Sequence, residues 1–235
     1  MSNRYVDFVS DEHFLDCVKW VCKAYPHNPD EIDMEKLQKN TIDPFKVVFD
    51  LMNGSMSVDS WLENESIRQN DKTINNTIGE FHQKLLGGVN GWDNLGVGDE
   101  SKVDLRKSDK TIFVELKNKW NTMNSDATEQ CRTKLERAVA GNPNAIAYWA
   151  YIISQNGISG ESTWYYQGKI DVRVKKIWGK KVYELVTGDA GALENTWKAL
   201  PSAIKDLIKS NHKPSRTDEQ KLQEFFEVAF GEIPQ

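Results

Sequence analysis

Apolar side chains recur at helical spacing through the first third of the chain. In residues 11–25 they fall on one helical face, behind an aspartate suited to capping. Similar patterns predict further helices over residues 44–53, 57–70 and 75–86. We therefore expect residues 1–70 to form a helical region that precedes a different kind of structure.

The pattern changes to that of a β-hairpin at Val103. The sequence VDLRKSDKTIFVELK reads as two short strands joined by a polar turn, because turn-forming residues separate two segments that favour strands. A two-residue turn at Asp109 and Lys110 would place Asp104 directly opposite Glu115. The hairpin therefore predicts two carboxylates facing each other across neighbouring strands.

Longer elements follow the hairpin. Residues 145–154 form a nearly continuous apolar run of strand length, which is typical of a strand buried on both faces. A helix is expected before it, ended by Gly141, Asn142 and Pro143. This helix is predicted over residues 127–140. The remaining predicted elements are strands over 164–174 and 181–186 and helices over 194–209 and 218–230.

This order of elements predicts an α/β (α+β) fold with a central mixed β-sheet flanked by helices. A chain of 235 residues is long enough for one large domain with its own core. We expect a single domain over residues 1–235. Its parts would be a helical N-terminal region over 1–70, a core over 75–190 and C-terminal helices over 191–235.

Composition and charge narrow the function. The net charge of −5 and the pI of about 5.5 argue against a general DNA-coating protein, which is usually basic. Residues 28–65 hold nine acidic and three basic side chains, whereas residues 169–183 hold six basic ones against Asp171 alone. One face is therefore expected to be positive, although ordinary strand surface charge explains the basic run equally well.

No apolar run approaches 18 residues and the first residues resemble no signal peptide, so we expect a cytoplasmic protein without a membrane span. The three cysteines are few and odd in number, which is consistent with reduced thiols. His13, Cys17, Cys22 and His27 do not have the spacing of common zinc sites, so packing is the better interpretation.

The hairpin brings together residues that could hold a cation. Side chains alternate along a strand, so Glu115 and Lys117 share one face of the hairpin. Asp104 is expected on the same face, across from Glu115 on the neighbouring strand. The packed face is expected to be formed by Ile112, Val114 and Leu116. Opposed like charges destabilise a strand pair unless a cation lies between them, and Mg²⁺ commonly binds one or two carboxylates. A solvated hairpin with mixed surface charges would show the same pattern.

Asp104, Glu115 and Lys117 resemble the catalytic residues of the PD-(D/E)XK nuclease superfamily, with Val103 in place of the commoner proline. The segment Thr77–Asn124 resembles the core of a type II restriction endonuclease family that includes enzymes cutting GGNCC sites. The resemblance implies a restriction endonuclease-like fold and Mg²⁺-dependent hydrolysis of double-stranded DNA at a short G·C-rich palindrome.

The resemblance also implies roles for individual residues. Asp104 and Glu115 would bind the metal, the backbone carbonyl of Leu116 could complete its ligands, and Lys117 would hold the attacking water and the scissile phosphate. Related nucleases often add a glutamate from the preceding helix, which here is Glu80. A surface pair between Glu80 and Lys84 is the alternative, and for His82 a structural role is expected.

Bases would be read by polar groups just after the catalytic strand and by basic residues elsewhere, because asparagine suits adenine whereas lysine and arginine suit guanine. The candidates are Asn118, Lys119, Asn121, Thr122, Asn124, Arg132, Lys134 and Arg173.

A palindromic target implies a two-fold symmetric homodimer. The amphipathic C-terminal segment, which includes Leu222, Phe225 and Val228, could contribute to the dimer or pack within the monomer. A bacterial restriction enzyme further implies a cognate DNA methyltransferase that acts on the same site. Two alternatives remain open from the sequence: a DNA repair or recombination nuclease, and a non-catalytic DNA-binding protein with the same fold.

Overall fold

The computed structural model describes residues 3–26, 32, 34–40, 42–96, 103–168, 170–208 and 215–231. The chain divides into two compact units. One unit comprises Met1–Lys19 and Gly79–Gln235, and the other comprises Trp20–Ile78. We call them the sheet unit and the helical unit and consider each by itself. None of the described helices is long and apolar enough to cross a bilayer.

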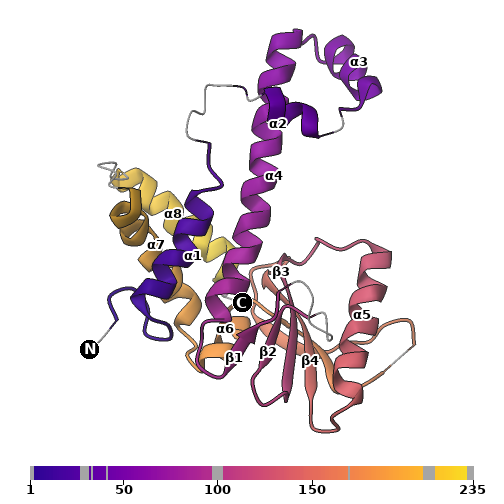
Figure 1. Ribbon diagram of the computed structural model, residues 1–235, viewed down its shortest axis with the longest axis vertical. Helices are drawn as coiled ribbons and strands as arrows, with labels where there is room; N and C mark the ends of the chain where they lie inside the picture. The colour runs from indigo at the N-terminus through magenta and orange to yellow at the C-terminus, as the bar shows by residue number, and fades with distance from the viewer. Residues whose placement is uncertain are drawn as a thin grey trace. The chain divides into compact units, whose positions relative to one another are not determined.

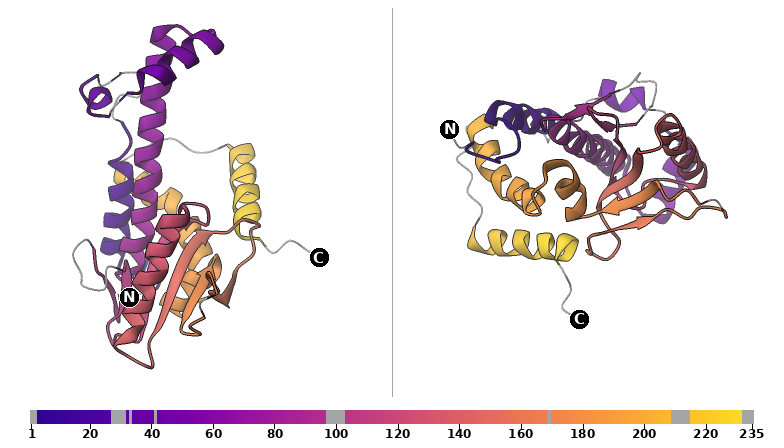
Figure 2. Two further views of the ribbon diagram at one scale, coloured as in Figure 1. Left: turned by 90° about the vertical axis from the view of Figure 1, so that its right-hand side faces the viewer. Right: turned by 90° about the horizontal axis from the view of Figure 1, so that it is seen from below.

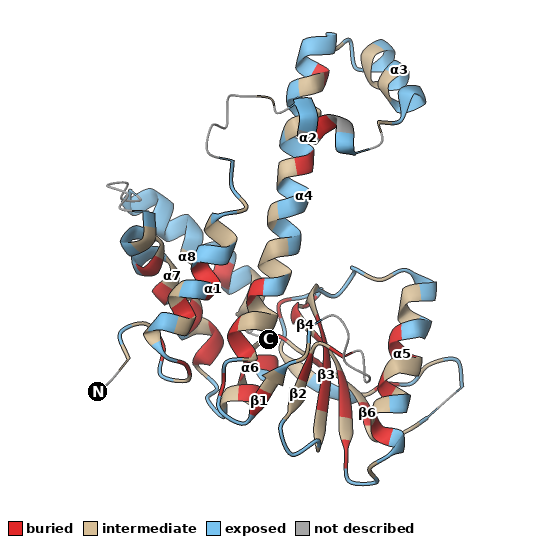
Figure 3. Cartoon of the chain, viewed as in Figure 1, coloured by how far each residue is buried: buried red, intermediate tan, exposed pale blue. Residues whose placement is uncertain are grey.

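The helical unit contains α2 (Met34–Lys39), α3 (Pro44–Asn53) and the first part of α4 (Val58–Leu86). α3 begins where the sequence predicts, because Asp43 accepts hydrogen bonds from the backbone of Phe45 and Lys46 and proline occupies the first turn. The Trp61 indole donates to Asp50 at 3.0 Å, which joins α4 to α3. α3 has no buried residue, and it appears pale blue over much of its length in Figure 3.

α4 is one helix, so the prediction of separate helices over 57–70 and 75–86 was wrong. The segment between them contains neither proline nor glycine to stop a helix. The polar residues there bond within the helix: the hydroxyls of Thr73 and Thr77 donate to the carbonyls four residues earlier. Polarity alone therefore did not mark a helix end.

The described strands form one six-stranded mixed sheet, as predicted, in the order β1-β2-β3-β4-β6-β5 (Figure 1). β3, β4 and β6 run parallel at its centre, and the other pairings are antiparallel. The strands are β1 Trp92–Asn94, β2 Leu105–Lys107, β3 Ile112–Lys119, β4 Ile146–Ile153, β5 Gly160–Thr163 and β6 Val174–Trp178.

The β2–β3 hairpin has the predicted register, with Arg106 opposite Phe113. The turn is longer than predicted, because β2 ends at Lys107 and β3 begins at Ile112. Lys110 closes the turn by donating its backbone N–H to the Lys107 carbonyl at 2.8 Å, and it has a φ of 58°. Asp104 precedes β2, and its backbone N–H donates to the Val114 carbonyl at 3.1 Å, so it lies beside β3 near Val114 rather than directly opposite Glu115 as predicted.

Two predicted strands were wrong. Residues 181–186 lie in the helix α6 (Lys180–Thr187), which buries Val182, Tyr183 and Val186 on one face. These positions satisfy a helical period as well as a strand pattern, and Gly188 ends the helix in the left-handed conformation with a φ of 75°.

Residues 164–174 mostly form the connection between β5 and β6. Gln167 and Gly168 have φ values of 47° and 75°, which interrupt an extended strand. Trp164, the first residue of the predicted strand, is a buried core residue 1% exposed.

α5 (Ser125–Ala140) covers one face of the sheet, and α6 and α7 (Ala192–Ile208) lie on the other side (Figure 2). α5 contributes Cys131, Leu135 and Val139 to a buried core. The sheet residues in the same core are Phe113, Ala147 and Val174. This packing fixes the height of α5 above β3, and hence the position of its polar residues relative to the hairpin.

The remaining helices of the sheet unit are α1 (Asp11–Cys22), whose residues from Trp20 on are assigned to the helical unit, and α8 (Arg216–Phe230). In α8 part of the C-terminal segment packs within the monomer, and its contribution to a dimer stays a prediction. Phe226 is buried and its ring lies 4.7 Å from that of Trp197, whereas Phe225 and Val228 are exposed.

Candidate active site

The site lies on β3, which is buried on both faces rather than on one. Val114 and Leu116 are buried as predicted, but Phe113 and Glu115 on the opposite face are also buried, at 6% and 5% exposed. The sequence predicted that this second face would be open. α5 covers it, so the carboxylate of Glu115 lies beneath a helix.

Four charged side chains meet there, and we call Asp104, Glu115, Lys117 and Lys134 the charge cluster. The Lys117 ammonium lies 2.8 Å from Glu115 Oε1 and 4.0 Å from Asp104 Oδ2. The Lys134 ammonium, from α5, lies 2.7 Å from Glu115 Oε2. The structure therefore brings together the three residues that the sequence selected and adds a second lysine.

Asp104 is held at the edge of the charge cluster by the backbone. Its Oδ2 accepts a hydrogen bond from the Leu116 N–H at 2.7 Å. Burial, followed by the negative charge of Glu115, raises the pKa of Asp104 to about 6, although Lys117 opposes the shift. The ionised form of Asp104 is therefore disfavoured even with Lys117 nearby, and an additional positive charge would stabilise it. This is expected of a carboxylate that binds a cation.

Lys117 is positively charged in this arrangement. Burial acts to lower its pKa, but the opposite charges of Glu115 and Asp104 outweigh burial and the pKa is raised above the usual value. Such an ammonium donates hydrogen bonds and does not accept a proton. Lys117 is therefore suited to orient a water molecule or a phosphate rather than to act as a base in this state.

The chemistry of the donors fits Mg²⁺. Two carboxylates from adjacent strands converge, and Mg²⁺ usually binds one or two carboxylates together with water and phosphate oxygens. The Leu116 carbonyl, a predicted ligand, is 3.4 Å from the side-chain nitrogen of Gln83. Across the described residues, no group of three or more histidine, cysteine or carboxylate side chains is placed to hold a metal, so the arrangement does not suggest zinc.

The structure does not place Glu80 with the two carboxylates. It is exposed on α4, and no three-carboxylate group with Asp104 and Glu115 exists in the described part of the chain. Gln83, one turn later, is the residue of this helix that reaches β3. No local signal singled out Gln83, because helical spacing places it near Glu80 but does not decide which of the two meets β3.

His82 has the structural role that the sequence favoured. Its Nδ1 lies 2.7 Å from the Tyr183 hydroxyl, and burial lowers the pKa of His82 to about 4. The rejected zinc set also consists of packed residues where it is described: His13 Nε2 lies 3.0 Å from the Lys84 carbonyl and 3.5 Å from Cys17. His27 lies outside the described residues.

Three predicted DNA contacts, Arg132, Lys134 and Arg173, bind other groups of the protein instead of projecting freely into solvent. Lys134 belongs to the charge cluster. Arg132 is 2% exposed, and its guanidinium donates to Glu136 and to the Trp164 carbonyl and lies over the Trp164 ring. Arg173 pairs with Asp171 at 2.8 Å and donates to the Val139 carbonyl. The two arginines thus stabilise the packing of α5.

Several described residues of the basic run at 169–183 are also paired, whereas Lys169 lies outside the described residues. Lys175 pairs with Glu161 at 2.7 Å and Lys181 with Glu184 at 2.8 Å. The Lys176 ammonium lies 5.0 Å from the centre of the Trp149 ring. Ordinary strand surface charge therefore explains more of the run than a continuous positive face does.

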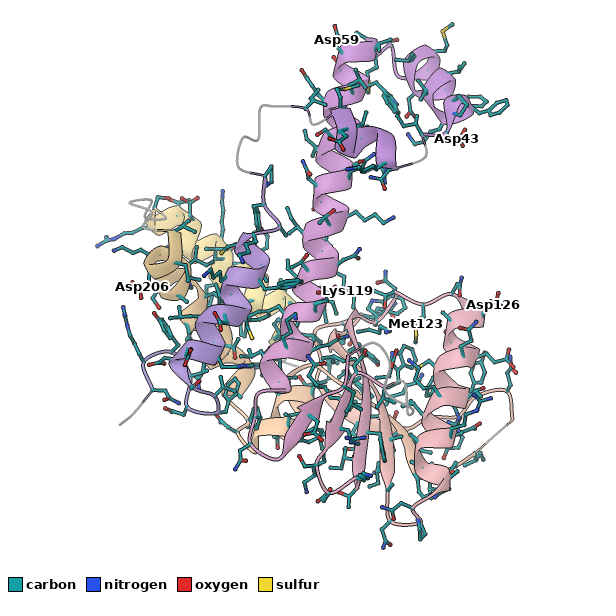
Figure 4. The ribbon with its side chains drawn as sticks, viewed as in Figure 1. Asp43, Asp59, Lys119, Met123, Asp126 and Asp206 are labelled. Carbon is teal, nitrogen blue, oxygen red and sulfur yellow. The ribbon has the colours of Figure 1, made fainter. Side chains whose placement is uncertain are left out.

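The end of β3 and the connection to α5 expose the other predicted DNA contacts. Lys119 and Asn121 are exposed, whereas the Oδ1 of Asn118 is buried and has no hydrogen-bond partner within the described part of the chain. Figure 4 labels Lys119 at the end of β3 and Asp126 at the start of α5. Two candidates have local roles instead: Asn124 caps α5 through the Ala127 N–H, and the Thr122 hydroxyl donates to the Lys119 carbonyl.

Arg132→Met is expected to lower the free energy of unfolding by about 2–4 kcal/mol, because it leaves the Trp164 carbonyl and Glu136 without their partner. Lys119→Met, which changes an exposed residue, should weaken DNA binding and leave unfolding within about 0.5 kcal/mol of wild type. Urea unfolding and a DNA titration in Ca²⁺ measure both effects. A stable Arg132→Met protein that no longer binds DNA would contradict this assignment.

Comparison with known proteins adds an independent observation. The model of the family described as Eco47II restriction endonuclease matches residues 6–209. The chain is 34% identical over 222 residues to the type II restriction enzyme Sau96I from Staphylococcus aureus, covering 89% of this chain and 84% of that protein. It is 29% identical over 240 residues to the type II restriction enzyme Eco47II from Escherichia coli, covering 96% and 99%.

Proposed function

The chain belongs to the Eco47II restriction endonuclease family, and we propose that it cleaves double-stranded DNA at a site formed by Asp104, Glu115 and Lys117, with Mg²⁺ as cofactor. Family membership makes it a type II restriction enzyme, a site-specific endodeoxyribonuclease. The observation that carries the choice of residues is the convergence of two carboxylates and the Lys117 ammonium on one face of the hairpin.

Each residue has a role that its surroundings support. Asp104 and Glu115 would hold Mg²⁺, aided by the Leu116 carbonyl, and the ion when bound would polarise the phosphoryl oxygens and lower the pKa of a bound water. Lys117 would orient the attacking water against the scissile phosphate, because its raised pKa keeps it a hydrogen-bond donor. The Leu116 N–H keeps Asp104 in place for this task. Glu80 has no role in this proposal.

The proposed target is a short G·C-rich palindrome of the GGNCC type. Each strand of a palindrome needs an equivalent site, so the active form would be a homodimer. Asn118, Lys119 and Asn121 are the residues that we propose to approach the bases, since they lie just beyond the catalytic strand. A cognate methyltransferase that modifies the same site would protect the host DNA.

Digestion of two plasmids of known sequence tests the proposal. In Mg²⁺ the protein should release discrete fragments, and sequencing of their ends should return one G·C-rich palindrome. The same reactions in EDTA should leave the plasmids intact. Random nicking, or cutting at branched DNA alone, would favour a repair nuclease, and the absence of cutting in both Mg²⁺ and Mn²⁺ would favour a non-catalytic binding protein.

A further inference from the structure

Glu115 is bound at both oxygens by lysines from different elements. Lys117, two residues along β3, lies 2.8 Å from Oε1, and Lys134, on α5, lies 2.7 Å from Oε2. The side chain of Glu115 is only 6% exposed, so water screens these pairs weakly. A cation that binds Glu115 must therefore displace or share at least one ammonium.

The charges of the cluster sum to zero in this state. Asp104 and Glu115 carry two negative charges, and Lys117 and Lys134 carry two positive ones. A divalent ion between the carboxylates would leave the cluster with two excess positive charges. A DNA strand supplies phosphates at the same place, and a displaced ammonium can pair with one of them.

Lys134 is the lysine that is free to change partners. Lys117 also faces Asp104 at 4.0 Å, so it retains a carboxylate when Glu115 is shared. Among the residues that the structure describes, Lys134 forms an ion pair only with Glu115, and 25% of its side chain is exposed. Lysine is a compact charge on a flexible stem, which allows its ammonium to move while its helix stays packed.

We propose that Lys134 exchanges Glu115 for a DNA phosphate when the divalent ion binds. In the metal-free protein it neutralises Glu115 beneath α5, and in the loaded complex it positions the DNA strand at the reacting centre. This inference rests on the proposed function, since it takes Glu115 as a metal ligand.

Lys134→Met tests separately whether Lys134 competes with the ion for Glu115 and whether it binds a DNA phosphate. The substitution keeps a side chain of similar length and removes the charge. Calorimetric titration with Mg²⁺ and with Mn²⁺, without DNA, should show binding about tenfold tighter than wild type, because one competing cation is gone. Single-turnover cleavage at saturating metal should be about ten- to a hundredfold slower, because a phosphate contact is lost. The two measurements should thus move in opposite directions.

Arg137→Met is the matched control, because Arg137 carries the same charge on the exposed side of α5. Its metal affinity and cleavage should remain within about twofold of wild type. Lys134→Arg keeps the charge, so it should restore most of the cleavage with a metal affinity near that of wild type. If Lys134→Met fails to fold by circular dichroism, Lys134→Gln replaces it with the same two expected changes.

Three results would overturn the inference. Unchanged metal affinity in Lys134→Met would show that Lys134 does not compete with the ion. Weaker metal binding would show that Lys134 only holds Glu115 in place for the ion. Tighter metal binding with undiminished cleavage would show that Lys134 does not position a DNA phosphate. If wild type itself neither binds Mg²⁺ nor cuts DNA, the proposed function fails first.

Discussion

Lys117→Ala is expected to slow DNA cleavage by about a thousandfold while specific DNA binding survives. The substitution removes the ammonium that would orient water and phosphate, and such groups contribute about 10²- to 10⁴-fold to a rate. Both carboxylates remain, and Glu115 keeps Lys134 as its partner at 2.7 Å. Single-turnover cleavage in Mg²⁺ and a mobility shift in Ca²⁺ measure the two properties.

The control for Lys117 is Lys107→Ala, since Lys107 lies in the same hairpin and pairs with Asp109 at the turn. It should cut at close to the wild-type rate. Cleavage by Lys117→Ala at more than about a tenth of the wild-type rate would remove Lys117 from the catalytic centre.

Asp104→Asn is expected to abolish cleavage and yet stabilise the metal-free protein at neutral pH. Burial, followed by Glu115, raises the pKa of Asp104 from 3.8 to about 6. The folded protein thus holds this proton more tightly than the unfolded chain does. The metal-free wild type therefore loses stability as pH rises through this interval, and the penalty is fully present above it.

An asparagine has no charge to oppose Glu115, and its oxygen can still accept the Leu116 N–H. The expected gain at pH 8 is about 1–3 kcal/mol, and it should vanish below about pH 4, where Asp104 is protonated in both states. Urea unfolding in EDTA across this range measures it. Added Mg²⁺ should stabilise wild type more than the variant, because the ion relieves the same repulsion. A variant less stable than wild type at pH 8 in EDTA would contradict the raised pKa.

The hairpin and the grouping of Asp104, Glu115 and Lys117 could be predicted because the signals are local. Strand alternation fixes which side chains share a face, and the hairpin register fixes which residues oppose one another. The hairpin brings Asp104 close enough for the Lys117 ammonium to lie near both it and Glu115. The apolar run of β4 likewise indicated a strand buried on both faces, which the structure places between β3 and β6.

The errors arose where a local pattern allows two structures. Residues 181–186 suit a strand or a helix, and packing of Val182, Tyr183 and Val186 selected the helix. The polar segment of α4 suggested a break, but backbone hydrogen bonds continue through it. Glu80 fell on the exposed side of that helix while Gln83 reached β3, a difference set by the direction in which α4 packs.

The sequence by itself determined the hairpin, the two carboxylates and the neighbouring lysine, because these depend on residues within about fifteen positions of each other. Only the tertiary structure decided that α5 covers Glu115 and that Lys134 binds it. Nineteen residues separate these two, and no local period relates a strand to the helix that packs on it. The burial of Leu135 and Val139 against the sheet sets that relation, and with it the ion pair between Lys134 and Glu115.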